Sequence, residues 1–186
     1  MIALRSFLVP TLVSAVAVFI VSSLIHMVLK WHASDYKGLA KEDAAAEGLR
    51  ASNPAPGIYR VPHCADMKEM SSPAMQAKYK DGPVAMVVVM PNGAPAMGKL
   101  LGLWFGYGFV VSLFCAYLAS RTLGAAAADL RIFRLVGTIA FMAYALPNLV
   151  DSIWKGFPWS VSLKHFFDGA LYAAATGAAF CWLWPR

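Results

Sequence analysis

The chain has 186 residues, of which 59% are hydrophobic and only 14% are charged. Because soluble domains carry roughly 25% charged residues, this composition favours a membrane protein over a soluble globular domain. The net charge of +6 would also suit a nucleic-acid-binding protein, but the basic residues are scattered and mostly flank apolar segments. Basic residues that flank membrane spans are retained on the cytoplasmic side and contact lipid headgroups, which explains that pattern. We therefore expect a lipid bilayer and no nucleic acid as the partner.

Residues 1–30 contain the first predicted transmembrane helix. Arg5 precedes an apolar run from Phe7 to Leu29. The run is longer than the 7–15-residue apolar core of a signal peptide, and no convincing cleavage site follows it. We therefore interpret this segment as an uncleaved membrane anchor.

Residues 31–99 differ in composition, because charges alternate in sign and prolines and glycines recur. Ser34 and Asp35 are candidate caps for a weak helix through Lys37 to Arg50. Further along, the sequence predicts short strands over 57–61 and 84–90, and a helix that starts at Pro73 and ends at Asp81. These elements form a small α+β loop domain. Two short strands seldom persist alone, so we expect the domain to rest on the helices or on a partner.

Residues 100–186 are predicted to form a three-helix transmembrane array, with spans over 100–119, 132–154 and 163–183. The first of these segments contains no charged residue, and a helix of about 20 residues matches the roughly 30 Å hydrocarbon core of a bilayer. Pro147 predicts a kink in the second. The predicted fold is thus an all-α membrane protein with four transmembrane helices and a small α+β extracytoplasmic domain between helices 1 and 2.

The distribution of arginine predicts the orientation in the membrane. In short loops, basic residues mark the cytoplasmic side. Five arginines fall on one side of the predicted layout: Arg5, Arg121, Arg131, Arg134 and Arg186. We therefore expect a multi-pass protein of the inner (cytoplasmic) membrane with both termini in the cytoplasm. The 31–99 loop would then lie outside, in the periplasm of a Gram-negative host.

Small residues recur at four-residue intervals in two of the predicted helices, and such stripes allow helices to approach closely in lipid. The residues concerned are Gly102, Gly106, Gly108, Ser112, Gly169 and Gly177. Two interpretations remain open. The stripes serve packing within the protein, or one of them docks another membrane subunit or a second copy of the chain.

Four ionisable residues are predicted at a similar depth near the outer ends of the spans: His26, Asp151, His165 and Asp168. Ionisable groups within spans are costly and need water or a partner. If the helices close around them, two imidazoles and two carboxylates would suit Zn²⁺, Mn²⁺ or Fe²⁺. Alternatively, these residues reach headgroup water, and Asp151 pairs with Lys155 one turn later.

A second candidate metal site lies in the loop, where His63, Cys64, Met67 and Met70 follow one another. Imidazole, thiolate and thioether are ligands for Cu(I), although methionine also serves as a simple gap-filler. A haem held between His26 and His165 is a further possibility, since these are the histidines available on facing spans. The sequence leaves the cofactor undetermined.

Common catalytic signatures are missing: there is no Gly-rich phosphate loop and no G-x-S-x-G, H-E-x-x-H or C-x-x-C-H motif. The sequence therefore predicts a non-enzymatic accessory or assembly subunit of an inner-membrane complex, in contact with other membrane subunits or with itself. The alternative function is handling of copper or zinc at the outer membrane face.

Overall fold

The computed structural model describes residues 2–186, which fall into two compact units. The helical unit combines the segment up to Tyr36 with Ala96–Arg186, and the loop unit comprises Lys37–Pro95. The chain segment that carries His32 and Asp35 therefore belongs to the helices, although the sequence assigned it to the loop domain.

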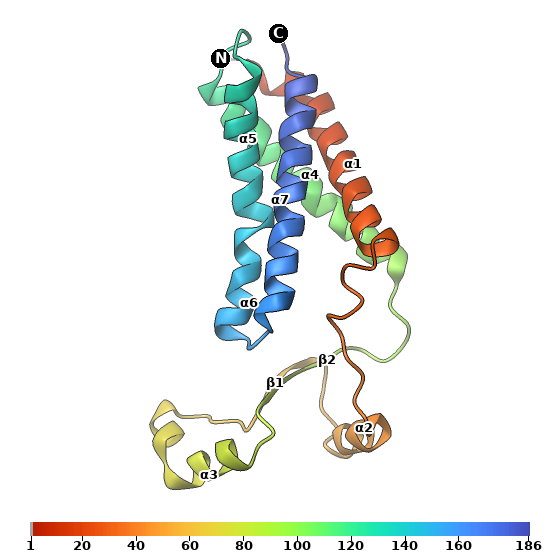
Figure 1. Ribbon diagram of the computed structural model, residues 1–186, viewed down its shortest axis with the longest axis vertical. Coiled ribbons are helices and arrows are strands. Elements are labelled where there is room, and N and C mark those ends of the chain that lie inside the picture. The colour runs from red at the N-terminus through yellow and green to blue at the C-terminus, as the bar shows by residue number, and fades with distance from the viewer. Residues whose placement is uncertain (1) are drawn as a thin grey trace. The chain divides into compact units, whose positions relative to one another are not determined.

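The helical unit contains four long helical segments (Figure 1). The first is α1 (Leu8–Ser23), flanked by η1 (Leu4–Phe7) and by a π-helical turn, η2 (Leu24–Val28). The others are α4 (Met97–Thr122), α5 (Asp129–Tyr144) with η4 (Leu146–Asn148) and α6 (Leu149–Trp154), and α7 (Trp159–Trp182). Helix α7 packs on α5 and α1, and α4 packs on α1 and α5.

Three of these segments are long and apolar enough to cross a membrane: Leu4–Val28, Met97–Thr122 and Asp129–Trp154, with mean hydropathies of 2.4, 1.7 and 1.4. The chain is thus a mostly helical protein with the features of a multi-pass membrane protein. Helix α7 is not among the three, although it has 24 residues. Lys164, His165 and Asp168 in its first turns lower its hydropathy, so the fourth span stays a prediction.

The predicted kink at Pro147 is present, because α5 ends at Tyr144 and a helix resumes only at Leu149. Proline lacks the N–H that would continue the helical ladder. The carbonyl of Ala143, which an N–H at position 147 would reach, accepts instead from the Tyr107 hydroxyl at 2.9 Å. The side-chain amide of Asn148 donates to the carbonyl oxygens of Tyr144 and Ala145, at 2.6 and 3.2 Å. The kink therefore leaves these carbonyls satisfied within the protein.

The small residues divide between buried and open positions. A Cβ on Gly169 would lie 2.5 Å from the Cα of Ala145, and one on Gly177 would lie 2.9 Å from the Phe133 ring, so both glycines serve the contact of α7 with α5. Ser112 is buried and accepts a hydrogen bond from Ser14 of α1 at 2.7 Å. Gly108 is also buried, against α1 and α5. By contrast, a Cβ on Gly102 or Gly106 would meet no atom within 4 Å.

The loop unit contains two helices, α2 (Glu42–Ala51) and α3 (Pro73–Asp81), the short η3 (Met67–Ser71) and two strands, β1 (Gly57–Val61) and β2 (Ala85–Val89). The strands pair antiparallel, with Gly57 opposite Val89 and Val61 opposite Ala85. This confirms the predicted strands, and the helix from Pro73, which Ser72 caps, is confirmed as well.

The helix predicted from Lys37 begins only at Glu42, and the predicted caps were wrong. Instead of capping a helix, Asp35 pairs with His32 and Lys164, and Ser34 accepts a hydrogen bond from Lys164 at 2.9 Å. Tertiary contacts of the helical unit thus override the local capping preference of these two residues.

Candidate metal site

Four side chains converge at one end of the helical unit: His26, His32, His165 and Asp168. Each offers one ligand atom, and these four atoms all lie within 4.8 Å of one another. Zinc binds nitrogen and oxygen ligands at roughly 2.0 to 2.2 Å. Small rotations of the side chains would therefore bring all four around a single ion.

The helix ends place these residues. His26 lies in the π-helical turn that closes the first helix, a feature that recurs at functional sites because it redirects side chains. Lys30 then adopts a positive φ of 47°, and this turn precedes His32. His165 and Asp168, three residues apart near the start of α7, share a face of that helix. Antiparallel packing of α1 and α7 brings the two ends together, as the contact of Phe7 with Phe180 at their opposite ends shows.

The three imidazole rings lie nearly parallel to one another, and His32 is the ring closest to both of the others. The ring centroids of His26 and His32 are 4.5 Å apart, and those of His32 and His165 are 4.7 Å apart, with interplanar angles of 8° and 17°. The centroids of His26 and His165 are 6.5 Å apart, so the three rings form a compact group in which each contacts the other two. The haem between His26 and His165 stays a prediction from the sequence.

Hydrogen bonds outside the cluster fix two of the rings. His26 donates from Nδ1 to the backbone carbonyl of Ser22 at 2.9 Å. Its other ring nitrogen, Nε2, can therefore act as the metal ligand. Nδ1 of His32 faces the Asp35 carboxylate at 2.5 Å, and its Nε2 faces Asp168 at 2.7 Å. Metal-binding histidines usually donate a hydrogen bond from their second ring nitrogen to a carbonyl or carboxylate in this way.

Asp35 is itself held in place, since its side chain is only 2% exposed and accepts a hydrogen bond from Lys164 Nζ at 2.5 Å. Burial raises the pKa of the Asp35 carboxyl, but the hydrogen bonds and charges of Lys164 and His32 outweigh this effect and hold the pKa below its usual value. Asp35 is therefore an ionised carboxylate that orients His32.

Without a metal, the same groups form a closed ion network. Both contacts of His32 are hydrogen bonds only if both of its nitrogens carry a proton. The imidazolium and Lys164 then balance the charges of Asp35 and Asp168. A metal ion would replace the proton on Nε2, as metal binding to histidine generally does. His165 also belongs to this network, since its Nδ1 lies 3.7 Å from the Asp168 carboxylate. His26 joins the site through its stacking on His32.

Of the first set predicted from the sequence, the structure brings together His26, His165 and Asp168 but not Asp151. Asp151 forms an ion pair with Lys155 at 2.6 Å, the alternative that the sequence offered. His32 and Asp35 were missed as site residues. The signal that could have found them is a histidine and an aspartate three residues apart, directly after the first span.

The second predicted set lies in the loop unit. Cys64 donates to the backbone carbonyl of Asp66 at 2.9 Å, and Met67 and Met70 are exposed. Within residues 2–186, His63 and Cys64 form no group of three with another histidine, cysteine or acidic residue.

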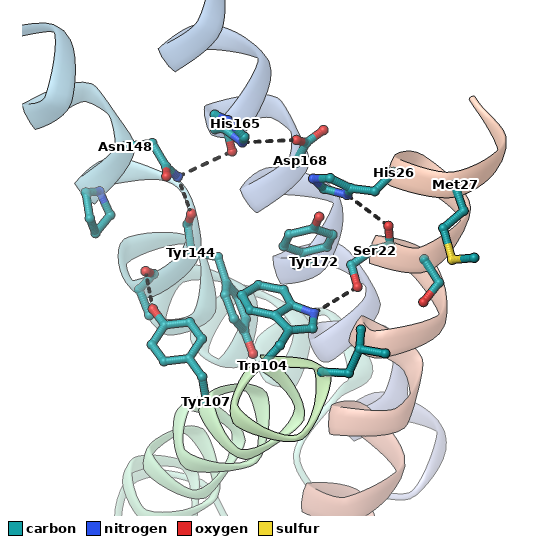
Figure 2. A pocket seen from close by; sticks show the side chains of 14 residues that line it. Ser22, His26, Met27, Trp104, Tyr107, Tyr144, Asn148, His165, Asp168 and Tyr172 are labelled. Carbon is teal, nitrogen blue, oxygen red and sulfur yellow. Dashed lines mark hydrogen bonds and ion pairs between the residues drawn. The ribbon is translucent and has the colours of Figure 1, made fainter. Parts of the chain in front are cut away.

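A cavity of about 400 Å³ adjoins the histidine cluster. Figure 2 shows His26, His165 and Asp168 together at one end of it, and Trp104 and Tyr107 at the other. His32 is not part of its lining. The cluster is therefore reached from the cavity on the side of the other three residues.

No protein-family profile matches this sequence, and no characterised protein or solved structure shows significant similarity to it.

Proposed function

We propose that the protein binds a divalent transition metal ion, first of all Zn²⁺, through His26, His32, His165 and Asp168. The observation that carries the proposal is the approach of all four ligand atoms to within 4.8 Å of one another. Three imidazoles and a carboxylate are a ligand set that zinc accepts, and other divalent transition metals share the preference for imidazole.

The surroundings of the cluster support this proposal over a purely structural ion network. Ser22 and Asp35 each accept a hydrogen bond from Nδ1 of a histidine. The Nε2 atom of each ring is then left to act as the ligand. A structural ion network would account for His165, which lies 3.7 Å from Asp168, but it does not require the stacking of His26 on His32.

The proposed setting is the outer face of an inner membrane. We place four spans in the bilayer, with α7 as the fourth, because α7 packs along two of the membrane-competent segments. The arginines would keep both termini in the cytoplasm. The histidine cluster lies at the ends of α1 and α7 that are away from the chain termini. The cluster would then face outward, and so would the 31–99 loop.

The direct test is metal analysis of the full chain, purified in mild detergent and dialysed against Zn²⁺. We expect about one zinc per chain, and a large loss of zinc in His165→Ala and in His32→Ala. Asp151→Asn and His63→Ala are the matched controls and should keep the metal. Zinc-free protein, or equal zinc contents in all five proteins, would refute the proposal.

A second candidate function is that of an accessory or assembly subunit, as the sequence predicted. The observation that favours it is the open stripe on α4, where a Cβ on Gly98, Gly102 or Gly106 would meet no atom within 4 Å. Close approach along such a stripe is how helices associate in lipid. Native mass spectrometry after gentle extraction should then show a bound subunit or second copy that Gly106→Leu releases. A monomer in both proteins would argue against this role.

A further inference from the structure

The cavity beside the metal cluster has the size and wall chemistry of a ligand pocket. Its volume of about 400 Å³ falls within the range of roughly 300 to 1,000 Å³ that is typical of small-molecule sites. Three of the four proposed metal ligands line it. A molecule in the cavity would therefore be next to the ion.

The far wall of the cavity is aromatic, and the polar tips of three of its side chains bond to other groups of the protein. Trp104 donates from Nε1 to Ser22 at 2.8 Å, and Tyr107 donates to the carbonyl of Ala143 at 2.9 Å. Tyr144 donates to the carbonyl of Gly108 at 3.4 Å. With their polar atoms bound to the protein, these residues present ring surface to the cavity.

The rings also touch one another and form a continuous wall. The centroids of Trp104 and Tyr107 are 5.7 Å apart, and Tyr172 lies 5.6 Å from Trp104 and 5.8 Å from Tyr144. Aromatic groups pack on such walls in stacked or edge-on contacts at similar distances. The two ends of the cavity thus differ: one can coordinate a metal and the other accepts a flat apolar group.

The rim of the cavity indicates where the ligand comes from. Met27 is 81% exposed and Tyr107 is 44% exposed. Both line the cavity and both belong to helical segments that are fit to cross a membrane. A molecule dissolved in the bilayer would therefore reach the cavity directly from the lipid.

We infer that this cavity binds a small membrane-dissolved amphiphile, consisting of an oxygen donor that coordinates the metal and a planar apolar body that packs against Trp104 and Tyr144. This inference rests on the proposed metal site and adds the class of its ligand. The donor would take the coordination position that faces the cavity, since zinc sites can expand from four to five ligands.

The test uses the full chain in detergent micelles, loaded with Co²⁺ in place of Zn²⁺. The visible absorption bands of Co²⁺ report its binding to the protein. Two hydroxamates then serve as probe ligands, and the binding of each is measured from the change that it causes in these bands. Benzohydroxamate and acetohydroxamate carry the same donor, but only the first has a planar apolar body. We expect benzohydroxamate to bind at least about tenfold more tightly, because its ring is buried.

Two variants show whether this preference arises in the cavity. Trp104→Ala removes part of the aromatic wall and Ala143→Leu fills space, so both should reduce the preference severalfold. Met142→Phe adds volume on the exposed neighbour of Ala143 and is the matched control that should keep it. The Co²⁺ spectrum of each variant shows whether the cluster remains intact.

The outcomes separate the two proposals. Absence of Co²⁺ bands would refute the metal site and with it the inference. Normal bands with equal affinity for the two hydroxamates would overturn the inference alone. So would a preference that persists in both cavity variants, since it would then arise from partition into the micelle. Equally tight binding of a sulfonated benzohydroxamate, which stays in water, would overturn the membrane route.

Discussion

The Asp35 carboxylate has a specific role in this site, because it fixes the ring of His32 without lining the cavity. It accepts from Nδ1 of His32, and Lys164 in turn holds the carboxylate. This arrangement commits Nε2 of His32 to the cluster. Such outer partners set the orientation and basicity of a metal-binding imidazole.

Replacing Asp35 with asparagine should therefore weaken metal binding without abolishing it. The expected loss in Zn²⁺ affinity is about 10- to 100-fold, the usual effect of removing an outer carboxylate. A competition titration with a zinc-sensitive dye would measure it. Asp129→Asn, which affects an exposed pair with Arg186 at the other end of the helices, is the control. Equal affinities in both variants would show that Asp35 does not orient a ligand.

At the scale of elements, the sequence carries most of the local information. The strand boundaries, the helix after Ser72 and the kink at Pro147 were predictable because proline, glycine and capping serine act within a few residues. The start of α2 was not, since Asp35 makes its contacts with α7 rather than with the following helix. A capping preference of about 1 kcal/mol yields to a buried, charge-assisted contact of this kind.

The close contact of α7 with α5 makes Gly169 sensitive to substitution. In Gly169→Ala the new Cβ would meet the backbone of Tyr144 and Ala145, which cannot rotate away. We expect a loss of about 1 to 3 kcal/mol in the free energy of unfolding, as for other overpacked sites. Thermal unfolding of the detergent-solubilised protein would measure the change.

Gly102→Ala is the matched control, because it adds the same methyl group on a helix where nothing lies within 4 Å. Alanine favours the helix by up to about 1 kcal/mol over glycine. This variant should therefore be as stable as the original protein or slightly more stable. If both substitutions had the same effect, α7 and α5 would not be packed as closely as the structure indicates.

At the scale of the whole molecule, helix depth could be predicted from the sequence but helix rotation could not. Span lengths place His26, Asp151, His165 and Asp168 at one level, yet which of them meet depends on the rotation of each helix about its axis. Asp151 follows the interruption at Pro147, so its direction is not set by the register of α5. His32 lies beyond the helix in a turn, where periodicity gives no information.

The orientation of the chain can be tested with its own cysteines. Cys115 is fully buried, whereas Cys64 and Cys181 are partly exposed. Cys181→Ala leaves Cys64 as the reactive thiol in the loop, and Cys64→Ala leaves Cys181 near the chain end. With both termini in the cytoplasm, a membrane-impermeant maleimide should label the first variant in intact spheroplasts. It should label the second only after lysis.

This labelling pattern bears directly on the metal site, because both follow from one topology. Cys181 donates to the carbonyl of Asp129 at the start of α5, while the cluster lies at the start of α7. If α7 spans the bilayer, its two ends face opposite compartments. If Cys181 were labelled from outside while Cys64 was protected, the topology would be the reverse of the proposed one. The histidine cluster would then lie on the cytoplasmic side. The metal ligands would be unchanged, but they would draw their ion from the cytoplasm.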